Sequence, residues 1–340
     1  MPEAQEQLPQ AASGSYRKLT ITTSILVYLL VLVGGIVRMS ESGLGCGPPG
    51  SGLHGWPFCG GRLVPMVDTH MIIEYSHRTL ASAIGILLIV LTVWARRSFR
   101  ENKAITRLSL AALAIVIFEG LLGGLTVEYN LMEELVAIHL GASMLLLGAL
   151  LALTRATRPT PIEGPEPARW LRKLAIVTSI TVLLTIMAGG YVAGTENQGA
   201  FATAHQAGAH YACGRQFPTC NDSFLPFGST RLLNIQLIHR TFTFITIALV
   251  LWLAIALLRA VRDRRLRIFA WAAIAVLATQ VLLGALNVWL DVWAGAGRNL
   301  VVAHLTVGTT LWIVIVWLTL SLLQMPRVVV IPELDAAAND

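Results

Sequence analysis

Residues 71–95 read MIIEYSHRTLASAIGILLIVLTVWA, and this stretch decides the fold. Beyond Arg78 it is almost entirely apolar. As a helix rising about 1.5 Å per residue, it is long enough to cross the roughly 30 Å hydrocarbon layer of a membrane. Glu74 and His77 lie inside the same stretch, where ionisable groups are costly to bury and usually serve a function. The stretch therefore predicts a membrane helix that carries functional groups near one end.

The composition extends this prediction to the whole chain. Hydrophobic residues make up 55% of the 340 positions and charged residues 13%, whereas a soluble protein carries roughly twice that charged fraction. We therefore expect an all-α membrane protein with eight transmembrane helices, built as two pseudo-symmetric four-helix bundles. The expected spans are 19–38, 71–95, 104–126, 134–155, 170–193, 234–258, 266–287 and 300–323.

The two halves of the chain repeat each other, which is the basis for predicting two bundles. The matching segments are Gly34-Gly35-Ile36-Val37 with Gly189-Gly190-Tyr191-Val192, Glu74-Tyr75-Ser76-His77-Arg78-Thr79 with Gln236-Leu237-Ile238-His239-Arg240-Thr241, Leu122-Gly123-Gly124-Leu125 with Leu283-Gly284-Ala285-Leu286, and Ala137-Ile138-His139-Leu140 with Val302-Ala303-His304-Leu305. The glycine pairs allow close approach of a helix or a flat ligand. The expected segments are an N-terminal tail (1–18), an N-terminal bundle (19–158), a linker (159–169), a C-terminal bundle (170–323) and a C-terminal tail (324–340).

Lysine and arginine predict the orientation. The connections after the second, fourth and sixth spans hold five such residues each, and the connection after the third span holds none. Because cytoplasmic loops carry the positive excess, we expect a multi-pass protein of the cell (plasma) membrane with both termini cytoplasmic. The net charge of +6 then comes from the connections on the cytoplasmic side, next to membrane lipid. It does not indicate a nucleic-acid partner. Nothing in the first 16 residues resembles a cleaved signal.

The four cysteines fall in two outer loops, as Cys46 with Cys59 and Cys213 with Cys220. Both loops are expected on the oxidising side of the membrane, where disulfides persist. Thiol pairs at such spacings also occur in metal sites, but no further cysteine or close histidine completes a four-ligand set. For Cys213 and Cys220 the spacing favours a disulfide.

Four of the eight histidines lie inside predicted spans, two in each half and all at a similar depth: His77, His139, His239 and His304. A single membrane histidine usually forms an interhelical hydrogen bond. Four at matched depth, placed by a repeat, instead predict two pairs of axial ligands to haem iron. A zinc or non-haem iron site would require further converging ligands.

Arginines are candidates to bind haem propionates, because a guanidinium pairs with a carboxylate through two hydrogen bonds. Arg78 and Arg240 each follow an axial-ligand candidate, and Arg38 is an extra cation of the first half. The alternative for the first two is an arginine that extends to the outer surface. The remaining histidines, His54, His70, His205 and His210, are expected to be solvated in outer loops.

The two halves differ at a position that indicates chemistry. Glu74 lies one helical turn from His77, and its counterpart in the second half is Gln236. A carboxylate beside a porphyrin is a candidate catalytic base, water-positioning group or stabiliser of positive charge. The alternative is an acid that only pairs with Arg78 or Arg38. The first half is therefore expected to be reactive and the second to be a fixed cofactor site. Solvation at the surface explains Glu128, Glu133 and Glu134.

In these features the chain resembles the haem A synthase family, in its bacterial type with two cysteine pairs. The resemblance rests on Gly34-Gly35-Ile36-Val37-Arg38, Ser42-Gly43-Leu44-Gly45-Cys46, Trp56-Pro57-Phe58-Cys59, Glu74-Tyr75-Ser76-His77-Arg78, the Gly123-Gly124 pair and the contexts of His139, His239 and His304. It implies an oxidoreductase that converts the methyl group at position 8 of haem O into a formyl group, giving haem A for cytochrome oxidase.

The resemblance also implies roles for individual residues. His77 and His139 would hold the substrate haem in the N-terminal half, and His239 and His304 would hold a haem b in the C-terminal half. Glu74 matches the essential acid of the family. The two cysteine pairs match those of the family, including a Cys46–Cys59 disulfide, although these two cysteines lie further apart than in most relatives.

Partners and alternatives complete the expectation. Haem O is the expected partner, the family suggests haem O synthase and cytochrome oxidase assembly factors as others, and a homo-oligomer stays open. The main alternative function is a di-haem b-type membrane cytochrome that only transfers electrons. A haem exporter or chaperone is a third. The chain contains no flavin or nicotinamide fingerprint, so electrons would have to leave through a haem or the cysteines.

Overall fold

The computed structural model describes residues 14–63, 68–157, 168–195, 208–228, 230–290 and 298–325. Within these ranges the regular structure is helical, and eight helices are long and apolar enough to cross a membrane. They are α1 (Gly14–Met39), α2 (Thr69–Ser98), α3 (Lys103–Glu128), α4 (Glu133–Ala156), α5 (Arg169–Gly194), α6 (Arg231–Ala260), α7 (Arg264–Trp289) and α8 (Arg298–Gln324). Two 3₁₀ turns, η1 (Gly52–His54) and η2 (Ala209–Tyr211), lie in the loops. The predicted all-α fold with eight membrane helices is confirmed.

Several helices begin before the predicted spans, because a polar residue caps the first turn. The side chain of Asp68 accepts a hydrogen bond from the backbone of Met71 at the start of α2, and Thr230 accepts one from Leu233 at the start of α6. Such caps satisfy backbone N–H groups that the helix leaves unpaired. Hydropathy detects only the apolar part of each helix, so the predicted spans were too short at these ends.

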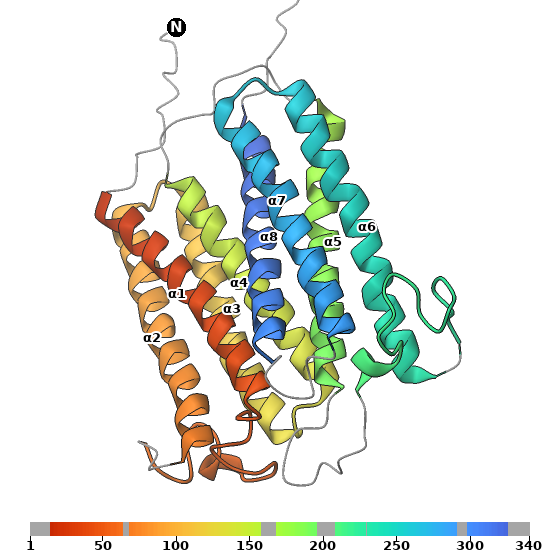
Figure 1. The fold of residues 1–340 in the computed structure, drawn as a ribbon. Coiled ribbons are helices and arrows are strands. Elements are labelled where there is room, and N and C mark those ends of the chain that lie inside the picture. The colour runs from red at the N-terminus through yellow and green to blue at the C-terminus, as the bar shows by residue number, and fades with distance from the viewer. Residues whose placement is uncertain are drawn as a thin grey trace, which may run out of the picture.

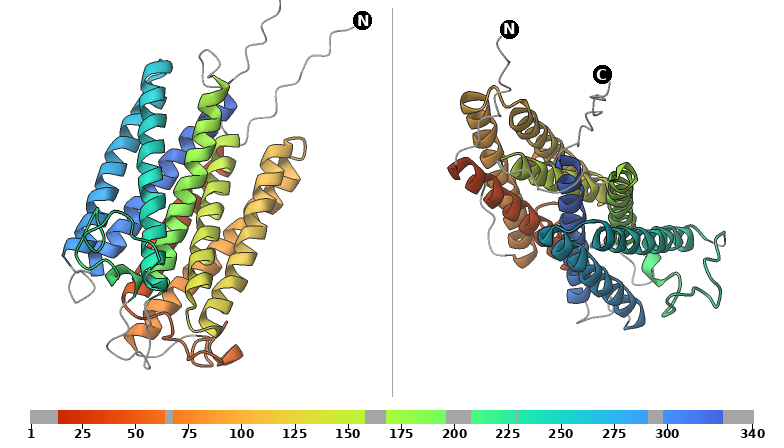
Figure 2. Two further views of the ribbon diagram at one scale, coloured as in Figure 1. Left: turned by 90° about the vertical axis from the view of Figure 1, so that its right-hand side faces the viewer. Right: turned by 90° about the horizontal axis from the view of Figure 1, so that it is seen from above.

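The helices form one elongated bundle in which α1, α4, α5 and α8 are central (Figure 1). The view from above shows α2 and α3 on one side of this centre and α6 and α7 on the other (Figure 2). Consecutive helices of each half pack against each other, and α4 packs against α5 and α8 of the second half. Across this interface the indole nitrogen of Trp312 donates to the carbonyl of Met144 at 2.9 Å.

Glycines bring the backbones of the two halves together at two equivalent crossings. A Cβ atom on Gly35 of α1 would lie 2.7 Å from Leu305 of α8, and one on Gly190 of α5 would lie 2.9 Å from Leu140 of α4. A larger side chain at either position would push the helices apart. The second glycine of the Gly34-Gly35 pair and of the Gly189-Gly190 pair therefore serves packing between the halves.

The two long loops, α1–α2 and α5–α6, lie at the same end of the bundle, opposite the short turns α2–α3 and α6–α7 (Figure 1). Each loop contains a disulfide, Cys46–Cys59 in the first and Cys213–Cys220 in the second. Cys213 and Cys220 pack with Leu233 and Leu237 of α6 in a small buried cluster. Both predicted disulfides are present.

Replacing Cys213 and Cys220 with serine is expected to destabilise the protein by about 2 kcal/mol, the chain-entropy value for so short a loop. The midpoint of thermal unfolding of the purified protein should fall. Mass spectrometry of untreated membranes should find this cysteine pair oxidised. An unchanged midpoint, or two free thiols in oxidised membranes, would contradict the prediction.

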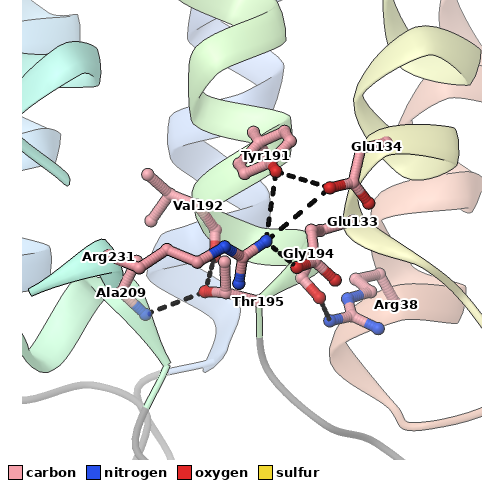
Figure 3. A network of polar contacts seen from close by, with 9 residues as sticks. All are labelled: Arg38, Glu133, Glu134, Tyr191, Val192, Gly194, Thr195, Ala209 and Arg231. Carbon is pink, nitrogen blue, oxygen red and sulfur yellow. Dashed lines mark hydrogen bonds and ion pairs between the residues drawn. The ribbon is translucent and has the colours of Figure 1, made fainter. Parts of the chain in front are cut away.

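A polar network joins the two halves near the disulfide end (Figure 3). Arg231 of α6 pairs with Glu133 and lies 3.6 Å from Glu134, both at the start of α4. The hydroxyl of Tyr191 of α5 donates to Glu134 at 2.7 Å. The expectation that these two glutamates are simply solvated was incomplete, because the repeat places them opposite α5 and α6 of the other half.

Candidate functional site

Four histidine rings lie against four glycines, each ring facing the helix that precedes its own. The distances from an ideal glycine Cβ position to the ring Cε1 atom are 3.2 Å for Gly34 and His77, 3.5 Å for Gly123 and His139, 3.0 Å for Gly189 and His239, and 3.0 Å for Gly284 and His304. The first glycine of each predicted pair thus makes room for an imidazole. This contact between a glycine and a histidine ring occurs four times, twice in each half of the repeat.

The histidines also share a depth and pair within each half. His77 and His239 lie eight residues into α2 and α6, and His139 and His304 lie six residues into α4 and α8, which is about 9–12 Å along the helix. His77 interacts electrostatically with His139, and His304 interacts with His239. Each half therefore holds one pair of imidazoles from its second and fourth helices.

The surroundings of the rings fit axial ligation. His239 Nδ1 lies 3.1 Å from the carbonyl oxygen of Thr185 on α5, whereas Nδ1 of His77 is buried without a hydrogen-bond partner among the described residues. An imidazole whose Nδ1–H is taken by a carbonyl presents Nε2 as a ligand. Within the described ranges no cluster of three or more acidic, histidine or cysteine side chains could hold a bare metal ion. A haem, which needs only two protein ligands, fits these residues.

Glu74 is buried, with 3% of its surface exposed, and it connects α2 to the first outer loop. Its Oε1 accepts a hydrogen bond from Arg78, and its Oε2 accepts one from the backbone N–H of Cys46 at 2.7 Å. The pairing with Arg78 was one of the two alternatives that the sequence left open. The bond to Cys46 could not be seen in the sequence, because it depends on how the loop folds back. In the second half, Oε1 of the buried Gln236 has no hydrogen-bond partner among the described residues.

The three propionate candidates bind backbone carbonyls in the structure. Arg78 donates to Gly55 and Phe58 of the first loop. Arg240 donates to Thr219 at 2.6 Å and Gln216 at 2.8 Å in the second loop. The two arginines therefore anchor the two disulfide loops in the same way.

Arg38 differs from the other two, since its guanidinium donates to the carbonyls of Ala193 and Gly194 at the end of α5. Figure 3 shows the contact with Gly194. It joins the first half to the second rather than a helix to its own loop.

One of the four loop histidines departs from the expectation that it is solvated. His210 in η2 is largely buried, and burial lowers the pKa of its imidazole to about 3. His70, in the first turn of α2, is exposed as expected, and its Nδ1 is 3.1 Å from the hydroxyl of Ser42. His54 is exposed, as expected, and His205 lies outside the described residues. Burial of His210 arises from loop packing, which the sequence does not encode in a local pattern.

Glu119 is a site residue that the sequence interpretation did not assign. It is buried in α3, and its Oε2 lies 3.1 Å from Nδ1 of His139. Its counterpart in α7 is Gln280, whose Nε2 lies 3.2 Å from Nε2 of His304. Extending the match of Gly123 with Gly284 by one helical turn would have revealed this second exchange of an acid for an amide.

Comparison with known protein families supports the site. Residues 17–316 match the model of the COX15-CtaA family, described as cytochrome oxidase assembly protein. The chain belongs to this family. The match spans all four histidines and both disulfides, so the COX15-CtaA assignment covers the whole candidate site.

Individual relatives with similar sequences agree with this family assignment. A protein of Shouchella clausii named "Heme A synthase" is 28% identical over 77% of this chain and 82% of its own length. A "Heme A synthase" of Alkalihalophilus pseudofirmus is 30% identical over 75% of this chain and 80% of its own. A third, of Symbiobacterium thermophilum, is 29% identical over 79% and 84%. The predicted resemblance is confirmed.

Proposed function

We propose that this multi-pass membrane protein, a haem A synthase by family and by its relatives, divides its work between its two halves. The N-terminal half holds haem O, the substrate, on His77 and His139. The C-terminal half holds a haem b on His239 and His304. The observation that carries the proposal is the pairing of imidazoles within each half, each ring lying against a helical glycine.

Haem A synthase is an oxidoreductase that converts haem O to haem A, and the bond changes take place at a methyl group of the porphyrin. A haem b bound in the second half would supply one-electron redox chemistry. The histidines of the first half would fix the iron, and hence the porphyrin, in one position. Holding the substrate in one orientation lowers the free-energy barrier of the reaction substantially.

Glu74 is the proposed acid of the reaction. Its carboxylate is held rigidly by Arg78 and by the N–H of Cys46, one turn from His77. A fixed negative charge in a water-poor site stabilises a developing positive charge or orients a water molecule. In the second half the neutral Gln236 cannot do this, which agrees with a site that only holds its cofactor.

The propionates of the two haems are proposed to reach Arg78 in the first half and Arg240 in the second, with Arg38 as a further candidate. Arg78 and Arg240 each lie on the same helix as a proposed axial histidine. Each also donates hydrogen bonds to carbonyls of the adjoining loop. One guanidinium has five donors, so it serves a loop carbonyl and a carboxylate together. The loop and the haem would then stabilise each other.

The proposed topology places both termini in the cytoplasm and the disulfide loops outside the cell membrane. The arginine-rich turns α2–α3 and α6–α7 lie at the end opposite the disulfides (Figure 1), which supports this orientation. The proposed units are the bundles 19–158 and 170–323, with the linker and both tails cytoplasmic. Haem O synthase, cytochrome oxidase assembly factors and a second copy of the chain are the proposed macromolecular partners.

The function is tested by the pigments of cells that make haem O but no haem A. Expression of this chain should bring haem A into the extracted pigments. Haem b alone would instead indicate the di-haem electron carrier, and unaltered haem O outside the membrane would indicate transport.

Replacing Gly189 with alanine is expected to weaken retention of haem b about tenfold, since overpacking a close contact costs about 1–3 kcal/mol. The new Cβ would lie 3.0 Å from Cε1 of His239 and would turn the ring away from its position. Haem content after purification is the measurement. Gly85→Ala is the matched control, because a Cβ at that helical glycine meets nothing within 4 Å. Equal haem content in both variants would contradict the proposed role of the glycine.

A further inference from the structure

Both histidines of the first half have a carboxylate at a position where the second half has a glutamine. Glu74 on α2 corresponds to Gln236 on α6, one turn before the histidine of each helix. Glu119 on α3 corresponds to Gln280 on α7, one turn before the glycine that faces the next histidine. The two exchanges lie on different helices, so they are separate differences between the two halves. The second exchange has no role in the proposed reaction.

The surroundings of Glu119 show what its carboxylate contacts. The residue is 8% exposed, and Oε2 accepts a hydrogen bond from the hydroxyl of Ser143 at 2.7 Å. The same oxygen lies 3.1 Å from His139 Nδ1, a buried atom that makes no hydrogen bond to the described residues in this side-chain geometry. No lysine or arginine pairs with Glu119 in the described part of the chain. The acid is therefore directed at the histidine.

A buried carboxylate inside a membrane helix is costly unless a positive charge or strong donors compensate it. Ser143 supplies one donor, and Oε1 of Glu119 has no hydrogen-bond partner among the described residues. An imidazole bound to ferric iron supplies what is missing, because it carries positive charge and a polarised Nδ1–H. The site is thus electrostatically complete when an iron is bound to Nε2 of His139.

We propose that Glu119, held by Ser143, is a positioning residue that accepts the Nδ1–H of His139 and makes this ligand more electron-donating than its counterpart His304. The inference rests on the proposed function, since it takes His139 as an iron ligand. A carboxylate bonded to a ligating imidazole fixes the ring and raises its basicity. Such a ligand stabilises ferric over ferrous iron and lowers the reduction potential.

The second half lacks this charge. Gln280 lies 3.2 Å from Nε2 of His304 rather than from Nδ1, and its amide is neutral. The haem of the first half consequently favours the ferric state more than the haem of the second half does. The repeat thus yields two haem sites of similar shape and different reduction potential.

The test is a redox titration of the purified, haem-loaded protein. Glu119→Gln makes the first half resemble the second at this position, and we expect it to shift the reduction equilibrium of the N-terminal haem at least tenfold towards ferrous iron, a rise of about 59 mV for one electron. Gln280→Glu should shift the C-terminal haem in the opposite direction. Thr126→Val is the control, because Thr126 is buried on α3 and, within the described part of the chain, its hydroxyl bonds only to the carbonyl of Leu122.

The outcomes separate this inference from the proposed function. If Glu119→Gln retains both haems with unchanged potentials, the inference is wrong. If Glu119→Gln loses its haem, the titration of Gln280→Glu decides, and an unchanged potential there overturns the inference. If His139→Ala leaves the N-terminal haem with two axial imidazoles by its low-spin spectrum, the ligand assignment fails instead.

Discussion

Replacing Glu74 with glutamine is expected to lower conversion of haem O by at least about 100-fold, the usual cost of removing one charge-stabilising group, while haem b stays bound. The substitution makes the first half match the second, where Gln236 is the natural residue. It retains the size of the side chain and one acceptor for the N–H of Cys46, but it removes the charge. Conversion is measured as haem A formed per protein, with hydroxylated haem as a second readout.

The structure offers an alternative explanation that this experiment must separate. Glu74 anchors the first disulfide loop through Arg78 and Cys46, so its loss could act through the loop alone. Thermal stability and oxidation of the Cys46–Cys59 pair report on the loop independently of turnover. Loss of conversion with both readouts unchanged supports the chemical role. Normal yield of haem A would show that Glu74 has only a structural role. The matched control is Glu134→Gln, which removes a carboxylate at the surface of α4.

Replacing His304 with alanine is expected to remove most of the haem b from the purified protein. One axial imidazole is lost, so any remaining iron is five-coordinate and weakly held. The absorption spectrum should lose its low-spin component, and His239→Ala should behave in the same way. His70→Ala is the control, since this histidine contacts Ser42 in the outer region and no haem site. A variant with full haem content and an unchanged low-spin spectrum would contradict the assignment of His304.

Hydropathy predicted the eight helices well because each span is a continuous apolar run, whose position depends only on local sequence. Helix starts were less accurate, since Asp68 and Thr230 cap helices from outside the apolar run. The four membrane histidines were found because the repeat presents two histidine positions twice, each in the same context. Their close contact with Gly34, Gly189 and Gly284 explains why the glycine pairs accompany them.

Contacts that depend on tertiary packing could not be predicted in the same way. Arg78 and Arg240 were assigned to propionates, yet the carbonyls they bind belong to loops whose path no local pattern specifies. Glu119 received no role from the sequence, because its distance to His139 depends on how α3 packs against α4. Glu133 similarly looked solvated because its partner Arg231 lies in the other half.

The division of labour between the halves is the central claim, and a comparison of two double variants tests it most directly. Haems are extracted from purified His77→Ala/His139→Ala and His239→Ala/His304→Ala proteins and separated by chromatography. We predict that the first variant retains haem b and lacks haem O and haem A, and that the second lacks haem b and retains bound haem O. Loss of the same haem from both variants, or retention of all haems in either, would contradict the account.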